Sequence, residues 1–102
     1  NQFAIAVCPG DIESPTVLAA QTANELLDIS GINASFVLTV YQEKIYMSAR
    51  SIDEVNVQII AEKLGGGGHI NSAGAQFDHT NMEEAISTLK ETIDDMIEKG
   101  DI

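Results

Sequence analysis

Four consecutive glycines followed by a histidine, residues 65–69, are the residues whose types and order best suit chemistry. One glycine is enough to end a helix, so the other glycines favour a backbone that approaches a ligand closely or adopts positive φ. Successive N–H groups in such a backbone can form a concave site for an anion such as phosphate. A flexible loop is the alternative interpretation of the same run.

His69 extends the anion-binding interpretation of the glycine run. Its imidazole can donate to a phosphate oxygen or, given a partner base, act as a proton donor, whereas the alternative is a purely structural histidine. The run is not a Walker loop, which needs a lysine and a hydroxyl after its last glycine. It is not a dinucleotide fingerprint, because that motif follows a strand and opens a helix.

Arg50 is the second candidate for anion binding and the single arginine of the chain. It lies in the segment Ser48-Ala49-Arg50-Ser51, at the end of a predicted strand. Its planar guanidinium can donate two parallel hydrogen bonds to one phosphate, which suits bidentate recognition. In so acidic a chain, a surface salt bridge is the alternative role.

The remaining polar clusters predict structure rather than chemistry. Asp78-His79-Thr80 is interpreted as a turn, because Thr80 is needed to cap the last helix. The pairs Glu83-Glu84 and Asp94-Asp95 flank an apolar stripe, which predicts a solvated helix face and not metal ligands or a catalytic dyad. Cys8, the one cysteine, follows an apolar run and is predicted to be a small buried thiol.

The elements that must position these residues begin with a strand and a helix. Residues 2–7 form a short apolar run, which predicts a buried strand. Ser14 and Pro15 then have the order of a helix cap and a first helical residue. The helix is predicted to run to about Ser30, where Gly31 ends it.

A hairpin is predicted next, from 35–41 and 45–50, which are rich in β-branched and aromatic residues. Only the three residues 42–44 separate these stretches. Alternation along the second strand sends Arg50 to the face opposite Met47.

The second half of the chain predicts a helix, a strand and a helix. Apolar spacing indicates a short helix over 57–64, with Asn56 or Asp53 as its cap, and a short strand over 73–77. Thr80 and Glu83 have capping-box spacing before the last helix, and Gly100 closes it. The apolar stripe of that helix comprises Met82, Ile86, Leu89, Ile93 and Met96.

The resulting order, βαββαβα, predicts an α/β (α+β) fold in which about three helices cover a mixed β-sheet. Its first six elements have the ferredoxin-like succession. We expect one domain, since the 102 residues contain no repeat or linker.

The charge of the chain restricts its partners. Sixteen acidic and five basic side chains give a net charge of −11, which disfavours binding to long DNA or RNA but leaves a small anionic ligand open. No uncharged apolar stretch reaches the roughly 18 residues of a membrane span, and the Asn1-Gln2 start lacks the basic end of a secretory signal. One cysteine permits no disulfide within the chain, which agrees with a cytoplasmic setting.

Residues 65–75, GGGGHINSAGA, resemble the signature of the DHH-associated C-terminal domain of DHH-family phosphoesterases. Ser48-Ala49-Arg50-Ser51 and Asn56-Val57-Gln58 precede it in the order typical of membrane-anchored cyclic-di-AMP phosphodiesterases of the GdpP type. The resemblance covers nearly the whole chain and implies that residues 1–102 are a single substrate-binding domain. Gly74 departs from the pattern, because related sequences often carry alanine there.

This resemblance implies a parent protein with transmembrane helices, a PAS domain, a degenerate GGDEF domain, a catalytic DHH domain and then this domain. The DHH domain would hold two manganese ions that activate water, and this domain would hold no cofactor, metal or catalytic residue. The isolated domain is expected to be inactive. The parent would be anchored in the bacterial cell membrane, and this domain would lie in the cytoplasm without direct membrane contact. A homodimer formed through the parent is possible.

The resemblance also implies roles for single residues. The parent would open cyclic-di-AMP to linear pApA, and this domain would bind and orient the nucleotide. His69 would contact a phosphate, and Arg50 would hold a phosphate or face the base. The backbone N–H donors to phosphate would be those of Gly66, Gly67 and Gly68, with Asn71 and Ser72 as further substrate-binding candidates.

Two other functions fit the same residues. The first is the accessory domain of a nano-RNase or oligoribonuclease of the same superfamily, because this domain type also occurs in oligoribonucleases, single-strand exonucleases and alanyl-tRNA synthetases. The second is a non-catalytic ligand-sensing or dimerisation module, since βαββαβ elements also build small regulatory domains.

Overall fold

A five-stranded mixed sheet is the centre of the computed structural model, which describes residues 2–8 and 15–101. The strand order is β1-β2-β3-β5-β4, with β1 parallel to β2 and every other pair antiparallel. The predicted class, a mixed sheet with three helices, is confirmed, and β4 is one strand more than predicted. The elements are β1 (Gln2–Val7), α1 (Pro15–Leu26), β2 (Ile32–Tyr41), β3 (Lys44–Ser51), α2 (Val57–Lys63), β4 (Gly67–His69), β5 (Ser72–Phe77) and α3 (Met82–Glu98).

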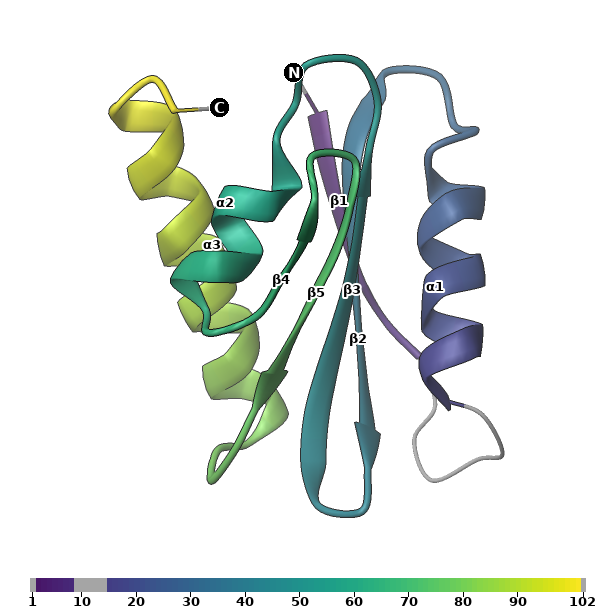
Figure 1. Ribbon diagram of the computed structural model, residues 1–102. Helices are drawn as coiled ribbons and strands as arrows, with labels where there is room; N and C mark the ends of the chain where they lie inside the picture. Colours follow the sequence, from purple (N-terminus) through teal and green to yellow (C-terminus); the bar gives the residue numbers. More distant parts are fainter. Residues whose placement is uncertain (1, 9–14, 102) are drawn as a thin grey trace.

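Helices cover both faces of the sheet (Figure 1), with α2 and α3 on one face and α1 on the other. The larger core lies under α2 and α3 and includes Phe36, Leu38 and Met47. The smaller core lies under α1, where Ala19 and Ala23 allow the helix to approach the sheet closely. Because β2 is covered on both faces, six consecutive residues, 34–39, are buried.

Helix α1 ends at Leu26, about one turn before the predicted end near Ser30. From Asp28 onward the backbone bonds span three residues, Asp28 N–H to Glu25 O and Ile29 N–H to Leu26 O, which tightens the last turn. The prediction was too long because the apolar stripe stops first, and the side chain of Ile29 is 53% exposed. Gly31, at φ 90°, turns the chain into β2, and the predicted cap Ser14 lies outside the described residues.

The predicted hairpin is confirmed, with a tighter turn than the three residues expected. Tyr41 pairs with Lys44, so only Gln42 and Glu43 form the turn. Their φ angles are 50° and 66°, and two consecutive positive φ values match the twist of antiparallel strands.

The helix caps are confirmed in one case and shifted in the other. Asn56 caps α2 and accepts from the N–H of Ile59 at 3.3 Å, as one of the two predicted alternatives. The cap of α3 is Asn81 and not Thr80, because Asn81 Oδ1 accepts from the N–H of Glu84 at 2.8 Å. The Thr80 hydroxyl instead donates to the Glu84 carboxylate at 2.9 Å.

Helix α3 presents the predicted stripe to the sheet, and Ala85, Leu89, Ile93 and Met96 are buried. The acidic pairs at 83–84 and 94–95 are exposed, as predicted for a solvated face. Among the residues that the structure describes, no helix combines the length and apolar character that crossing a membrane requires.

The ferredoxin-like succession of elements does not extend to the arrangement of the strands. A split βαβ unit would place a strand between the two parallel strands, whereas β1 and β2 are direct neighbours here. β1 therefore lies at one edge of the sheet, and the short strand β4 lies at the other.

Candidate functional site

Three of the predicted site residues lie in one row across the sheet. Arg50 on β3 pairs with Ser72 on β5, and Ser72 pairs with His69 on β4. Residues that face each other across antiparallel strands project to the same side of the sheet. We call Arg50, Ser72 and His69 the cationic row.

The cationic row projects to the side of the sheet that carries α1. Ser35, which pairs with Arg50, donates from Oγ to the carbonyl of Ala23 in α1 at 2.6 Å, and this bond fixes the side. Helix α1 contacts β2 and β3, whereas β5 and β4 contact α2 on the opposite face. Within the described chain, the α1 side of β5 and β4 is thus left without a helix over it.

We call this surface the open face, meaning the α1 side of β5 and β4 together with the adjoining residues Ser48 and Arg50 of β3. Ser72 and His69 are exposed on it, and Arg50 is half-buried. The row beside the cationic row contains Ser48, Gly74 and Gly67, so it has no side chain larger than a hydroxymethyl group. Ser48 was not among the predicted site residues, although its spacing of two residues from Arg50 places it on the same face.

The guanidinium of Arg50 is held close to its own backbone. Nη1 donates to the carbonyl of Ala49 at 2.8 Å. Across residues 2–8 and 15–101, no carboxylate oxygen lies within 4.0 Å of this guanidinium, and the ion pair that does form joins Lys99 to Asp95. The salt-bridge alternative for Arg50 therefore has no partner in the described chain.

The first two glycines of the run end helix α2. Gly65, at φ 89°, donates to the carbonyl of Glu62 at 3.1 Å, and Gly66 donates to the carbonyl of Ala61 at 2.8 Å. These two bonds form a Schellman motif. The predicted role of the Gly66 N–H as a phosphate donor needs correction, because this donor already has an acceptor within the helix.

Gly66 and Gly68 are also required by the close approach of β5. A Cβ atom on Gly66 would collide with the backbone of Gly74 and Ala75. On Gly68 it would lie 2.5 Å from the Cα of Ala73, and the φ of Gly68, 145°, is unfavourable for any side chain. The last two glycines of the run therefore begin the edge strand β4, whereas the sequence predicted a concave nest.

Gly67 is the one glycine of the run without such a requirement. A Cβ atom there would meet no described atom within 4 Å, and its φ lies outside the positive range. Gly67 pairs with Gly74, so its missing side chain leaves the open face bare beside the cationic row. Packing of the described chain therefore does not require a glycine at this position.

Asn71 has a different environment from the other candidates. It lies in the two-residue turn between β4 and β5, and its side-chain amide points to the loop that follows β3. Nδ2 donates to Ser51 Oγ at 2.9 Å and to the carbonyl of Asp53 at 3.0 Å. The amide thus already has acceptors within the chain, in contrast to the exposed Ser72.

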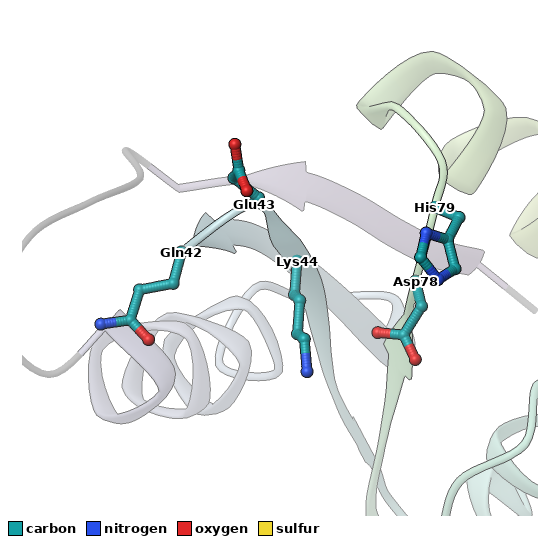
Figure 2. Close-up of a pocket in the computed structure, with 5 residues that line it drawn as sticks. All are labelled: Gln42, Glu43, Lys44, Asp78 and His79. Atoms are coloured by element: carbon teal, nitrogen blue, oxygen red, sulfur yellow. The ribbon is translucent and has the colours of Figure 1, made fainter.

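The opposite end of the sheet carries a hollow of about 380 Å³ that contains none of the predicted site residues. Figure 2 shows its lining, in which Asp78 and His79 follow β5, two residues form the β2–β3 turn and one begins β3. His79 has a φ of 55° in an irregular connection, as predicted for a turn. The other lining residues are Gln42, Glu43 and Lys44.

Metal-ligating clusters are absent from the part of the chain that the structure describes. No group of three or more His, Cys, Asp or Glu side chains is placed there to hold a metal ion. Cys8 is buried, as predicted, and its Sγ lies 3.5 Å from the Thr22 hydroxyl.

Known proteins resemble this chain over most of its length. It is 46% identical over 93 residues to the cyclic-di-AMP phosphodiesterase PdeA of Listeria monocytogenes, covering 90% of this chain and 14% of PdeA. It is 44% identical over 103 residues to the cyclic-di-AMP phosphodiesterase GdpP of Geobacillus thermodenitrificans, covering 98% of this chain and 16% of GdpP. The chain therefore corresponds to a small part of each relative.

A solved structure shares the fold. The exopolyphosphatase-related protein of Bacteroides fragilis superposes with a TM-score of 0.76 at 22% identity, covering 89% of this chain and 29% of that one. The family model of the DHHA1 domain matches residues 1–98. On this match, and on the identity to PdeA and GdpP, the chain belongs to the DHHA1 domain family.

Proposed function

We propose that this chain is the substrate-binding domain of a phosphodiesterase that opens cyclic-di-AMP to linear pApA. The names of its relatives support the substrate, since PdeA and GdpP are both cyclic-di-AMP phosphodiesterases. In this proposal the cationic row holds a phosphate of the nucleotide, and a DHH domain outside this chain performs the hydrolysis.

The observation that carries the proposal is the unpaired arginine of the open face. The chain has sixteen acidic side chains, yet its single arginine has no carboxylate within 4.0 Å in the described part. A guanidinium donates best to a planar pair of oxygens, and a phosphate offers such a pair. Arg50 is therefore available to an anion that comes from outside the chain.

The spacing of the row limits the size of that anion. Neighbouring strands lie about 4.8 Å apart, so the backbones of Arg50 and His69 are separated by about 10 Å, with Ser72 between them. Long side chains can close that distance around one phosphate. A net charge of −11 would repel a long phosphate backbone, which favours a small nucleotide.

Gly67 supports the same location for the ligand. Its bare backbone lies one row from His69 on the open face, so a sugar or phosphate can approach it without meeting a side chain. In the proposed complex, Gly67 and Gly68 face the phosphate with their backbone. Gly66 takes no part as a donor, because its N–H binds Ala61.

This chain contributes binding and orientation to the reaction. In the parent protein, two manganese ions in the DHH domain would activate the attacking water. His69 and Arg50 would hold the phosphate in line with that water, which lowers the entropic part of the barrier. The open face would become a closed site when the DHH domain covers it.

The parent protein is proposed to be anchored in the bacterial cell membrane, with this domain in the cytoplasm. Its direct partners would be the nucleotide and the DHH domain of the same chain. Neither long nucleic acid nor the membrane would contact it.

The test is hydrolysis of cyclic-di-AMP with manganese by three polypeptides: this chain alone, the DHH domain alone, and both joined. Activity in the joined polypeptide alone supports the proposal. Equal activity of the DHH domain alone would make this chain a sensing or dimerisation module. A joined polypeptide that ignores cyclic-di-AMP but cleaves five-nucleotide RNA would instead assign it to the nano-RNases.

A further inference from the structure

The turn between β4 and β5 carries a group of hydrogen bonds that the proposed ligand contacts do not use. We infer that Asn71 is a positioning residue: its amide ties this turn to the end of β3 and so fixes His69 relative to Arg50. The inference rests on the proposed function, because it assigns to Asn71 a task within that site. It differs from a direct role of Asn71 in binding the nucleotide.

Asn71 is bonded to the segment after β3 through both its side chain and its backbone. Nδ2 donates to Ser51 Oγ at 2.9 Å and to the Asp53 carbonyl at 3.0 Å, and it lies 3.4 Å from the Val55 carbonyl. The Asn71 carbonyl accepts from the N–H of Ser51 at 3.1 Å. The side-chain amide of Asn71 therefore donates toward the loop after β3 and not toward the open face.

Ser51 is the counterpart of Asn71 in this group. It follows Arg50 directly, pairs with Ala34, and is 6% exposed. Its Oγ lies 2.6 Å from the Val55 carbonyl, to which it donates, and it accepts from Asn71. Because neighbouring residues of a strand alternate between faces, Ser51 projects away from the open face and cannot touch a ligand there.

The other residue of the turn is anchored to helix α2. The Ile70 carbonyl accepts from the N–H of Val57, the first residue of α2, at 2.9 Å. The carbonyl of Asp53 belongs to a residue at φ 56°, so Asn71 also stabilises an uncommon backbone conformation in the loop. The turn is therefore held by β3 on one side and by α2 on the other.

This anchoring matters because His69 lies on a weak strand. β4 has three residues, two of them glycines, and it is bonded to the sheet through β5 at the edge. Short edge strands with glycine are easily lost without support from outside. A small shift of a residue that orients substrate can lower the rate of a reaction strongly.

The experiment measures kcat/KM for cyclic-di-AMP in the full-length protein that contains this chain. The variants are Asn71→Ala, Ser51→Ala, His69→Ala and the double variant with Asn71→Ala and His69→Ala. We expect Asn71→Ala and Ser51→Ala each to lower kcat/KM about tenfold, in line with one or two lost hydrogen bonds. In the His69→Ala background, Asn71→Ala should change kcat/KM less than about threefold, because the residue it positions is gone.

Three results would overturn the inference. If Ser51→Ala kept wild-type kcat/KM while Asn71→Ala lost activity, Asn71 would touch the nucleotide directly. If Asn71→Ala lowered kcat/KM equally with and without His69, its role would be general folding, and the melting temperature of the variant should then fall too. If Asn71→Ala kept wild-type kcat/KM while His69→Ala lowered it, the position of His69 would not depend on the hydrogen bonds of Asn71.

The failure of the proposed function would look different. His69→Ala with wild-type kcat/KM would remove the phosphate contact at the cationic row, and the positioning role would fall with it. If His69→Ala lowered kcat/KM and any of the three results above were also found, the inference about Asn71 would fail while the proposed function would stand.

Discussion

The two ends of the sheet each carry one of the two histidines, and different side chains surround each histidine. The end with His79 has a hollow of about 380 Å³, lined by both acidic and basic side chains. At the end with His69, the cationic row brings a histidine and the single arginine onto one face, and no carboxylate oxygen of the described residues lies within 4.0 Å of that arginine. The hollow at the His79 end is lined by none of the side chains that are predicted to bind an anion.

The difference has a physical origin in the backbone. Three residues that line the hollow, Gln42, Glu43 and His79, have positive φ, in the β2–β3 turn and in the connection after β5. The cationic row arises from strand register, which aligns residues far apart in the sequence on one face. Under the proposed function, the cationic row would become enclosed when the DHH domain covers it.

The largest expected effect comes from a substitution that prevents β4, the strand that carries His69, from packing on β5. Gly68→Ala places a Cβ atom 2.5 Å from the Cα of Ala73 at a φ of 145°, so we expect a loss of about 2–4 kcal/mol in the free energy of unfolding. Gly67→Ala, one residue earlier, should stay within about 0.5 kcal/mol of the wild type. Urea unfolding of this chain measures both, and equal losses would contradict the described packing of β4.

The next effect compares the histidines directly. His69→Ala should lower kcat/KM for cyclic-di-AMP about ten- to 150-fold, since it removes a charge-assisted contact worth about 1.5–3 kcal/mol. His79→Ala is the matched control and should stay within about twofold, because it lies at the opposite end of the sheet. If His79→Ala lowered kcat/KM more than His69→Ala did, the nucleotide would bind at the hollow and not at the cationic row.

The smallest effect tests the bare backbone beside the cationic row. Gly67→Val adds a branched side chain to the open face, where no described atom lies within 4 Å of its Cβ position. We expect KM to rise about fivefold, equivalent to about 1 kcal/mol of lost binding, with little change in melting temperature. An unchanged KM would mean that the nucleotide does not approach Gly67.

Much of the fold could be predicted because the apolar periodicity was strong. The stripe of α3, the hairpin and the short helix α2 all follow from local patterns and are confirmed. The end of α1 and the cap of α3 were misplaced by local competition, since Asn81 caps at least as well as Thr80. β4 could not be predicted, because glycines lack the propensity for a strand and only pairing with β5 orders them there.

The candidate site was predicted in its residue types but not in its arrangement. Arg50 and His69 stood out as the single arginine and as the residue after the glycines. Their alignment through Ser72 depends on two strand pairings, one of which involves the unpredicted strand. The bonds of the Asn71 amide depend on a loop that follows another strand, so no local pattern could indicate them.

The glycine run divides into three positions that the fold requires and one position, Gly67, that it does not. Gly65 and Gly66 end a helix, and Gly66 and Gly68 admit a neighbouring strand, so any protein with this architecture needs them whatever it binds. Gly67 alone is free of that demand. A search for the whole signature in other genomes therefore retrieves an architecture, and under the proposed function the residues that distinguish one substrate from another would lie around Gly67 on the open face.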